Sequence, residues 1–247
     1  MLKFQKGNAK LGTNVVTFSL PAGWSCPFAT ECLAKVAVDE NGKRSVVDGK
    51  EMKFRCFAAS QEAQYTNTYK ARQYNFDMLR KLKTVDEIAD LIENSLPKIG
   101  KRAKPYKGYK QIVRVHVSGD FYNQKYFDAW NEVAKRNPDR LFYAYTKSVK
   151  YWVARLGDIA DNFSLTASEG GRNDAMIIAF DLKCASVVYS EQAAADKGLE
   201  IDHDDKLAMF GKESFALLLH GTQPKDSDAS EALKELKRQG KGGYSRK

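Results

Sequence analysis

The chain has 247 residues, of which 43% are hydrophobic and 29% are charged, a balance typical of a soluble globular protein that can bury a substantial core. Its net charge is +9, and no apolar run approaches the ~18 residues of a membrane-spanning helix. The first residues form no apolar signal segment, which excludes a secreted or membrane-inserted class and predicts a protein of the cytoplasm. In that reducing compartment the four cysteines are expected to be thiols or metal ligands rather than disulfides.

The first quarter of the chain combines a strand, three cysteines and a hairpin. A β-rich run over residues 15–20 ends at a Pro-Ala-Gly turn and is followed by Cys26 and Cys32. The dipeptide Asn41-Gly42 predicts a hairpin that lies between these two cysteines and Cys56. We expect residues 1–60 to act as a cysteine-bearing N-terminal segment.

The rest of the chain alternates between helix and strand patterns. Residues 58–82 contain neither Pro nor Gly and predict one long helix, and Thr84 with Glu87 forms a capping box for the next helix, which runs to about residue 95. Strands are predicted over residues 112–118, 141–146, 162–167, 176–181, 186–189 and 215–219, and helices over residues 124–136, 148–159, 192–197 and from 227 to Gly240. This alternation predicts βαβ units around a parallel sheet. We expect one α/β domain over residues 1–247, built as a complete or partial TIM-like (βα) barrel.

The positive charge is confined to two segments. Residues 98–110 carry six positive charges and no negative charge, and residues 234–247 carry six positive charges and one negative charge. Such segments suit contact with a phosphate backbone or another acidic partner, and the residues proposed for nucleic-acid binding are Lys101, Arg102, Lys104 and Lys107. Simple solubility explains the loop and the flexible tail of residues 240–247 equally well.

Three clustered cysteines indicate a metal centre, since thiolates bind soft and borderline metals. Zinc usually occupies closed sites with C-x2–4-C pairs, whereas Cys26 and Cys32 are six residues apart and Cys56 lies beyond the hairpin. Iron–sulfur clusters accept more varied spacing, so a [4Fe–4S] cluster is the favoured cofactor and zinc is the alternative. Buried free thiols are a further possibility. Cys184 is equally consistent with a fourth ligand and with a core thiol.

Several linked motifs resemble those of the phage gene product 88-type family. They are Phe18-Ser19-Leu20-Pro21-Ala22-Gly23, Ser25-Cys26-Pro27 with Cys32, Arg55-Cys56-Phe57-Ala58, His116-Val117-Ser118-Gly119-Asp120-Phe121 and Phe142-Tyr143-Ala144-Tyr145-Thr146-Lys147-Ser148. The resemblance covers most of the chain. It implies a phage-encoded protein that acts in the host cytoplasm, and it implies no particular reaction.

A more distant likeness is to radical S-adenosylmethionine enzymes, which combine a three-cysteine cluster with a (βα) barrel. The segment Ser118-Gly119-Asp120 would take the place of their glycine motif after an early strand. Those enzymes typically have C-x3-C-x2-C in one loop, whereas a hairpin splits the cysteines here. The likeness implies S-adenosylmethionine as a cofactor, and this departure in spacing argues against it.

A second group of candidate residues follows the predicted strands, because the carboxyl ends of parallel strands collect functional side chains at one edge. The candidate catalytic residues are His116, Asp120, Lys147 and Glu169, with Ser118, Tyr145, Thr166, Ser168, His220 and Gln223 at equivalent places. The run Asp202-His203-Asp204-Asp205 suits either a hard cation or an exposed helix start.

The sequence thus supports three hypotheses. The first is a phage iron–sulfur protein with a polar pocket beside the cluster, an arrangement that would suit a redox or radical-type enzyme. The second is a nucleic-acid-binding protein in which a cluster or zinc is structural. The third is a non-catalytic protein that binds a host protein. No phosphate-binding loop, dinucleotide-binding turn or serine nucleophile elbow occurs, so the sequence gives no support to enzymes that depend on those motifs.

Overall fold

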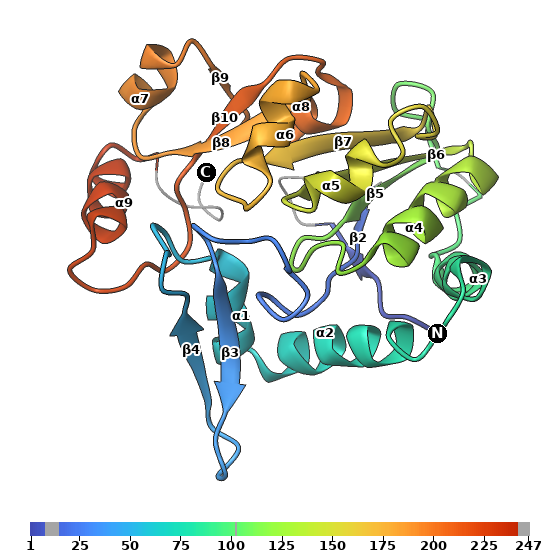
Figure 1. Ribbon diagram of the computed structural model, residues 1–247, viewed down its shortest axis with the longest axis horizontal. Helices are drawn as coiled ribbons and strands as arrows, with labels where there is room; N and C mark the ends of the chain where they lie inside the picture. Colours follow the sequence, from blue (N-terminus) through green and yellow to red (C-terminus); the bar gives the residue numbers. More distant parts are fainter. Residues whose placement is uncertain (8–14, 102, 242–247) are drawn as a thin grey trace.

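A mostly parallel eight-stranded sheet forms the centre of the computed structural model, which describes residues 1–7, 15–101 and 103–241 (Figure 1). Its strands lie in the order β1-β2-β5-β6-β7-β8-β10-β9. They comprise β1 (Gln5–Lys6), β2 (Val15–Thr17), β5 (Gln111–Val115), β6 (Arg140–Thr146), β7 (Phe163–Ser168), β8 (Cys184–Val188), β9 (Glu200–Ile201) and β10 (Phe215–Leu218). Among the strand pairings of the described residues in this sheet, that of β1 with β2 is antiparallel and the others are parallel.

The sheet is open, so the expectation of a closed TIM-like barrel is wrong for the described residues. Strands β1 and β9 stand at the two ends of the strand order, and each of them pairs with one neighbour. Both have only two residues, and β1 runs against the direction of the others, so neither offers a long parallel edge for closure. A mixed α/β fold with a parallel sheet is confirmed.

The helices differ from the sequence-based expectations at three places. Their bounds are α1 (Phe57–Gln64), α2 (Thr66–Leu79), α3 (Val85–Ser95), α4 (Gln124–Arg136), α5 (Val149–Val153), α6 (Asp174–Ala179), α7 (Glu191–Asp196), α8 (Lys206–Phe210) and α9 (Asp228–Arg238). The helix predicted over residues 58–82 is broken at Tyr65, whose backbone is extended, and the helix predicted from residue 148 ends at Val153. The strand predicted over residues 176–181 is instead helix α6, where Ile178 is 86% exposed.

Each face of the sheet packs against a different set of helices. On one face, Val113, Val115 and Phe142 contribute to a core that also contains the buried aromatic residues of α4 and the apolar residues of α3. On the other face, Ile112 and Leu141 belong to a core with Ala208 and Met209 of α8. Successive strand residues therefore face opposite cores, as the two-residue period of a strand requires.

The predicted capping box at Thr84 and the predicted hairpin are confirmed. Thr84 Oγ1 accepts a hydrogen bond from the Glu87 N–H within a complete capping box, and Ser227 caps α9 through the Ser230 N–H at 3.1 Å. Strands β3 (Ala34–Val38) and β4 (Arg44–Asp48) form an antiparallel hairpin that projects from the rest of the molecule (Figure 1). None of the described helices has both the length and the apolar composition needed to cross a membrane.

Candidate metal centre

The three N-terminal cysteines lie at the carboxyl edge of the sheet. Cys26 and Cys32 belong to the connection that leaves β2, and Cys56 directly precedes α1. Strand β2 is parallel to β5 through β10, so this connection meets the loops that leave those strands. Each of the three cysteine segments contacts a different one of these loops.

The Cys26 segment packs against the loop after β5. Leu20 donates its N–H to the carbonyl of Ser118 at 2.8 Å, and the Ser25 hydroxyl donates to the Pro21 carbonyl at 2.7 Å. Gly119 has a φ of +84°, and a Cβ at this position would lie 2.7 Å from Leu20 Cβ and closer still to Ser25 Oγ. Only glycine allows this approach of the two loops.

The Cys32 segment is bound to the loop after β7. The backbone N–H groups of Thr30 and Glu31 both donate to the Gly170 carbonyl, at 3.2 and 3.1 Å, and the Thr30 hydroxyl donates to the same oxygen at 2.7 Å. Gly170 has a φ of +91°, and an added Cβ would lie 2.9 Å from Glu31 Cβ. The residue that precedes Cys32 is therefore fixed to this loop by backbone hydrogen bonds and by close packing.

The Cys56 segment is bound to the loop after β10. The Gln223 side chain accepts a hydrogen bond from the Arg55 N–H at 2.7 Å and donates to the carbonyls of Arg55 and His220, at 3.3 and 3.0 Å. A Cβ on Gly221, whose φ is +83°, would lie 2.5 Å from Phe57 Cβ. Both neighbours of Cys56 are thus held by one short loop.

These contacts bring the three cysteines to the wall of one cavity of about 170 Å³. The cavity is also lined by residues of the parallel strands and of the loops that follow them, including Arg114, His116, Ser118, Gly119, Asp120, Tyr145, Thr146, Lys147, Ser168 and His220. Of the four candidate catalytic residues, His116, Asp120 and Lys147 line it, whereas Glu169 does not. Cys184 is also absent from its wall and lies in an apolar cluster with Val149, Ala167, Ile177 and Leu182.

Burial keeps the cysteine thiols protonated in the metal-free protein. It raises the pKa of Cys32 to about 12, although the nearby Lys147 cation opposes this shift. Burial also raises the pKa values of Cys26 and Cys56, and the three thiols influence one another electrostatically. The N–H groups of Ala58 and Ala59, in the first turn of α1, partly offset the shift at Cys56. A metal that binds here must displace the thiol protons.

Two charged residues after the strands are held rigidly beside the cysteines. Asp120 accepts hydrogen bonds from the Thr146 hydroxyl at 2.6 Å and from the N–H groups of Phe121 and Lys147 at 2.7 and 2.8 Å. Burial nevertheless raises its pKa to about 6. Lys147 Nζ donates to the Ser168 hydroxyl at 3.0 Å and to the carbonyls of Ser168 and Glu169. Among the described residues none of its hydrogen-bond acceptors is a carboxylate.

His116 occupies a buried and strained position. Its backbone has a φ of +67°, and its side chain is enclosed by Phe18, Phe121 and Tyr126. Burial lowers its pKa to about 3, so the ring is neutral at physiological pH. Non-glycine residues with positive φ are uncommon and concentrate at functional sites, which supports the assignment of His116 to the site.

Arg114 of β5 and Tyr145 of β6 add polar side chains to the cavity wall. Arg114 Nη1 lies 2.6 Å from Asp205 Oδ2, and the Tyr143 hydroxyl donates to the same oxygen at 2.9 Å. The Arg114 guanidinium also lies 5.2 Å from the Tyr145 ring centroid. Asp205, which directly precedes α8, belongs to the run that the sequence analysis considered for a hard cation. In the structure its carboxylate instead pairs with Arg114 of β5.

Glu62 connects the site segments, and the sequence analysis did not identify it. This fully buried α1 residue accepts hydrogen bonds from the Ala22 N–H at 2.9 Å, from the Ser118 hydroxyl at 3.1 Å and from Arg72 Nη1 at 2.8 Å. It therefore joins the Cys26 segment, the loop after β5 and the helix that follows Cys56. A glutamate on a predicted helix gives no sequence signal of such a role.

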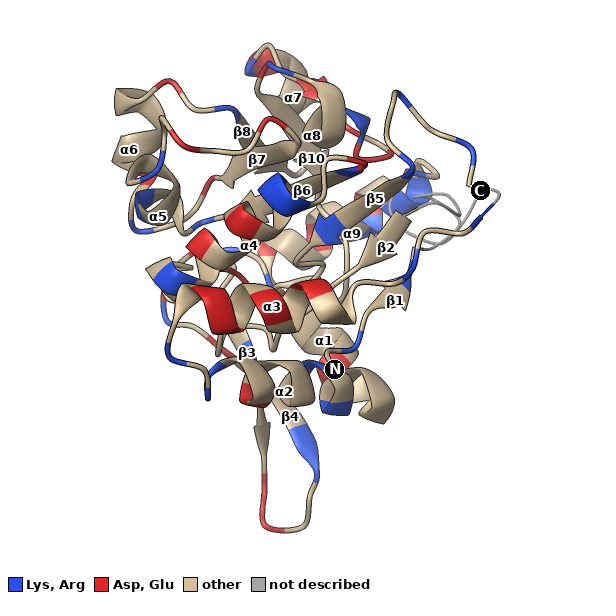
Figure 2. Ribbon diagram, turned by 90° about the vertical axis from the view of Figure 1, so that its right-hand side faces the viewer, with Lys and Arg blue, Asp and Glu red and all other residues tan. Residues whose placement is uncertain are grey.

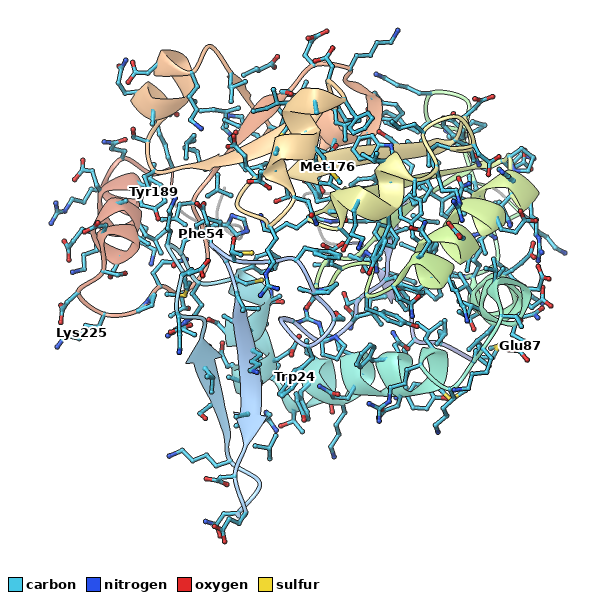
Figure 3. All side chains as sticks on the ribbon, viewed as in Figure 1. Trp24, Phe54, Glu87, Met176, Tyr189 and Lys225 are labelled. Carbon is cyan, nitrogen blue, oxygen red and sulfur yellow. The ribbon has the colours of Figure 1, made fainter. Side chains whose placement is uncertain are left out.

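Glu169 contributes to a second, more polar cavity of about 390 Å³. Its carboxylate accepts a hydrogen bond from the Ser186 hydroxyl at 2.5 Å and lies 3.4 Å from Lys197 Nζ. Phe54 and Val187 line both cavities, and Phe54 lies near Tyr189, another residue of this second wall (Figure 3). The two cavities are therefore neighbours that share part of one wall.

Across residues 1–7, 15–101 and 103–241, no group of three or more His, Cys, Asp or Glu side chains is arranged to hold a metal ion. Four ligands that share one ion must converge on a single point, as in a structural zinc site. The irons of a cubane cluster occupy separate corners, so their ligands surround a larger volume. Cys26, Cys32 and Cys56 line one cavity, into which they come from separate segments of the chain.

Of the residues proposed for nucleic-acid binding, the described ones, Lys101, Lys104 and Lys107, do not line the cavity of the cysteines. Lys107 lies over the Phe210 ring at 4.3 Å, and Tyr106 contacts the same ring edge-on, so part of the basic loop packs on α8. Arg102 and most of the basic tail lie outside the described residues. The ribbon in Figure 2 shows acidic residues (red) gathered on α3 and basic residues (blue) spread over several elements.

Comparison with known proteins identifies the family. The family model described as "Gene product 88" matches residues 2–238. The chain is also 25% identical over 213 residues to the "Gene 88 protein" of Mycobacterium phage L5, which covers 85% of this chain and 73% of that protein. No solved structure matches the chain, and the likeness to radical S-adenosylmethionine enzymes receives no support. The chain belongs to the gene product 88 family of phage proteins.

Proposed function

We propose that this protein binds a [4Fe–4S] cluster through Cys26, Cys32 and Cys56. The observation that carries the proposal is the convergence of three thiols from separate segments on one cavity. Three glycines with positive φ, in the loops after three strands, permit the close packing that brings those segments together. Buried free thiols would not require this arrangement, because an isolated thiol packs as an ordinary small apolar group.

The charges around the cavity suit a thiolate-ligated group. A cluster with three thiolate ligands brings negative charge into a partly buried site, where uncompensated charge is costly. Lys147 provides a buried positive charge near Cys32, and its acceptors are a hydroxyl and carbonyls. The N–H groups at the start of α1 also favour a thiolate at Cys56. Both features stabilise the ligated state more than the metal-free state.

A redox role follows from this chemistry. A bound [4Fe–4S] cluster supplies one-electron transfer at a potential set by its ligands, its hydrogen bonds and its exposure. Within this chain, Asp120 fixes the loops after β5 and β6, and His116 presents a neutral ring to the same cavity. The Arg114 and Tyr145 side of the cavity leaves a polar wall against which a small molecule can bind.

Anaerobic purification and optical spectroscopy test the proposal. We expect a brown protein whose charge-transfer absorption bleaches on reduction and which then gives a low-temperature EPR signal of a reduced cluster. Substitution of serine for Cys26, Cys32 or Cys56 should remove the absorption, whereas Cys184→Ser should retain it. A colourless protein with stoichiometric zinc, or one that remains colourless after reconstitution with iron and sulfide, would contradict the proposal.

A further inference from the structure

Three cysteines leave one iron of the proposed cluster without a protein ligand, and the described residues allow the candidates for it to be compared. Cys184 lies in an apolar cluster and does not line the cavity. Besides the cysteines, the arginines and Tyr145, whose hydroxyl burial keeps protonated by raising its pKa well above the usual value, four lining side chains carry a potential donor atom and a titratable group, namely those of His116, Asp120, Lys147 and His220.

Asp120 and Lys147 are committed to hydrogen bonds within the protein. Both carboxylate oxygens of Asp120 accept hydrogen bonds, from two backbone N–H groups and one hydroxyl. Lys147 Nζ donates to three oxygen atoms, which accounts for all the protons of an ammonium group. Coordination by either residue would break contacts that hold the loops after β5, β6 and β7.

The lone pair of His116 is used by Tyr126. His116 Nε2 lies 3.0 Å from the Tyr126 hydroxyl, and the Trp130 indole, which can only donate, is a further hydrogen-bond partner of that hydroxyl. The hydroxyl proton needs an acceptor, so the tyrosine donates to Nε2 and the imidazole proton is on Nδ1. An imidazole in this state offers the cavity an N–H group and no lone pair for a metal.

In His220 the ring nitrogen that makes the hydrogen bond is Nδ1 rather than Nε2. Its Nδ1 lies 3.2 Å from the Leu218 carbonyl, and a carbonyl can only accept, so the proton is on Nδ1 and the lone pair is on Nε2. Histidines that ligate metals commonly donate their other N–H to a backbone carbonyl in this way. The centroid of the His220 ring also lies 4.9 Å from that of the Phe57 ring, and Phe57 is the residue that follows Cys56 in the chain.

We infer that His220, through Nε2, is the fourth protein ligand of the cluster. The inference rests on the proposed function and adds its missing ligand. Gln223 binds the backbone of both His220 and Arg55, so one side chain places the fourth ligand beside Cys56. Imidazole is a suitable ligand for iron, and it is neutral where thiolate is negative. Replacement of thiolate by imidazole raises the reduction potential of a cluster.

Nitrogen hyperfine spectroscopy on protein labelled with 15N-histidine tests this ligand. The chain has three histidines, so three single variants assign any signal. We expect a strongly coupled nitrogen in the reduced cluster of the wild type, of His116→Asn and of His203→Asn, and its loss in His220→Gln. His220→Cys should retain the cluster, lose the nitrogen coupling and shift the reduction potential downward. Thermal unfolding of each variant identifies any loss that comes from misfolding.

The outcomes separate the two proposals. A wild type that takes up iron and sulfide but shows no nitrogen coupling overturns the His220 assignment and leaves cluster binding standing. Coupling that persists in His220→Gln and disappears in His116→Asn also overturns the assignment. A wild type that takes up neither iron nor sulfide overturns cluster binding and the assignment together.

Discussion

Replacement of Gly119 by alanine should destabilise the protein more than the same change at a glycine with open surroundings. The backbone at Gly119 has a φ of +84°, and a Cβ there would meet Leu20 Cβ at 2.7 Å and Ser25 Oγ at a still shorter distance. The left-handed conformation costs an L-residue about 1–2 kcal/mol. Overpacking against a buried neighbour adds about 1–3 kcal/mol, so we expect a total loss of about 2–5 kcal/mol.

Gly198 is the matched control for this substitution. Its φ is +65°, and no atom lies within 4 Å of the position that a Cβ would take. Gly198→Ala therefore carries the conformational cost without the clash, and the reduced entropy of the unfolded chain is common to both variants. Anaerobic urea unfolding of the two variants isolates the packing cost, which we expect to be about 1–3 kcal/mol. Gly119→Ala should also lose iron, because the Cys26 segment must move.

Equal destabilisation of the two variants would refute this reasoning. It would mean that the loop after β5 and the Cys26 segment can separate without cost, and that the cysteines are not held in place by the glycine contacts. Greater destabilisation of Gly119→Ala with unchanged iron content would confirm the packing and contradict its link to the site.

Three further predictions concern the buried polar residues. Because burial lowers the pKa of His116 from 6.5 to about 3, the unfolded chain binds a proton between these values that the folded protein does not. The resulting stability is present above pH 6.5 and is lost as the pH falls toward 3, by about 4–5 kcal/mol in all. The difference between the unfolding free energies of the wild type and His116→Asn, measured as a function of pH, should show this slope. Glu62→Gln removes the carboxylate that pairs with the buried Arg72 guanidinium and should lower the unfolding free energy by about 3–5 kcal/mol. A loss below about 1 kcal/mol, the range of an exposed pair, would show that the contact is weak. Lys147→Met should reduce the iron retained per chain after gel filtration, and equal retention in Lys147→Met and the surface variant Lys150→Met would exclude a role for the buried charge.

Much of the fold was predictable because its signals are local. Helix α4 was predicted at its observed bounds from helical spacing, and the Thr84 capping box and a last helix starting near residue 227 were also correct. The segment at residues 176–181 was misassigned because a short apolar run has no period that separates a strand from a crossover helix. Barrel closure depends on the pairing of edge strands far apart in the chain, which alternation of helices and strands does not determine.

The sequence located the candidate site but not what holds it together. The cysteine spacing and the carboxyl-edge rule selected Cys26, Cys32, Cys56 and the residues after β5 and β6 as candidates. In the structure these residues line one cavity. The rule also selected Glu169, whose side chain turns to the neighbouring cavity and binds Ser186. The contacts of Glu62 and Gly221 are long-range and leave no local pattern, so only the three-dimensional structure shows them.

The most direct test of the cluster is the iron and acid-labile sulfide content of anaerobically prepared protein. We predict about four iron atoms and about four sulfides per chain in the wild type and in Cys184→Ser, as a [4Fe–4S] cluster requires. The variants Cys26→Ser, Cys32→Ser and Cys56→Ser should lose most of both. A wild type with no sulfide, or an iron content that is indifferent to these three cysteines, would contradict the account.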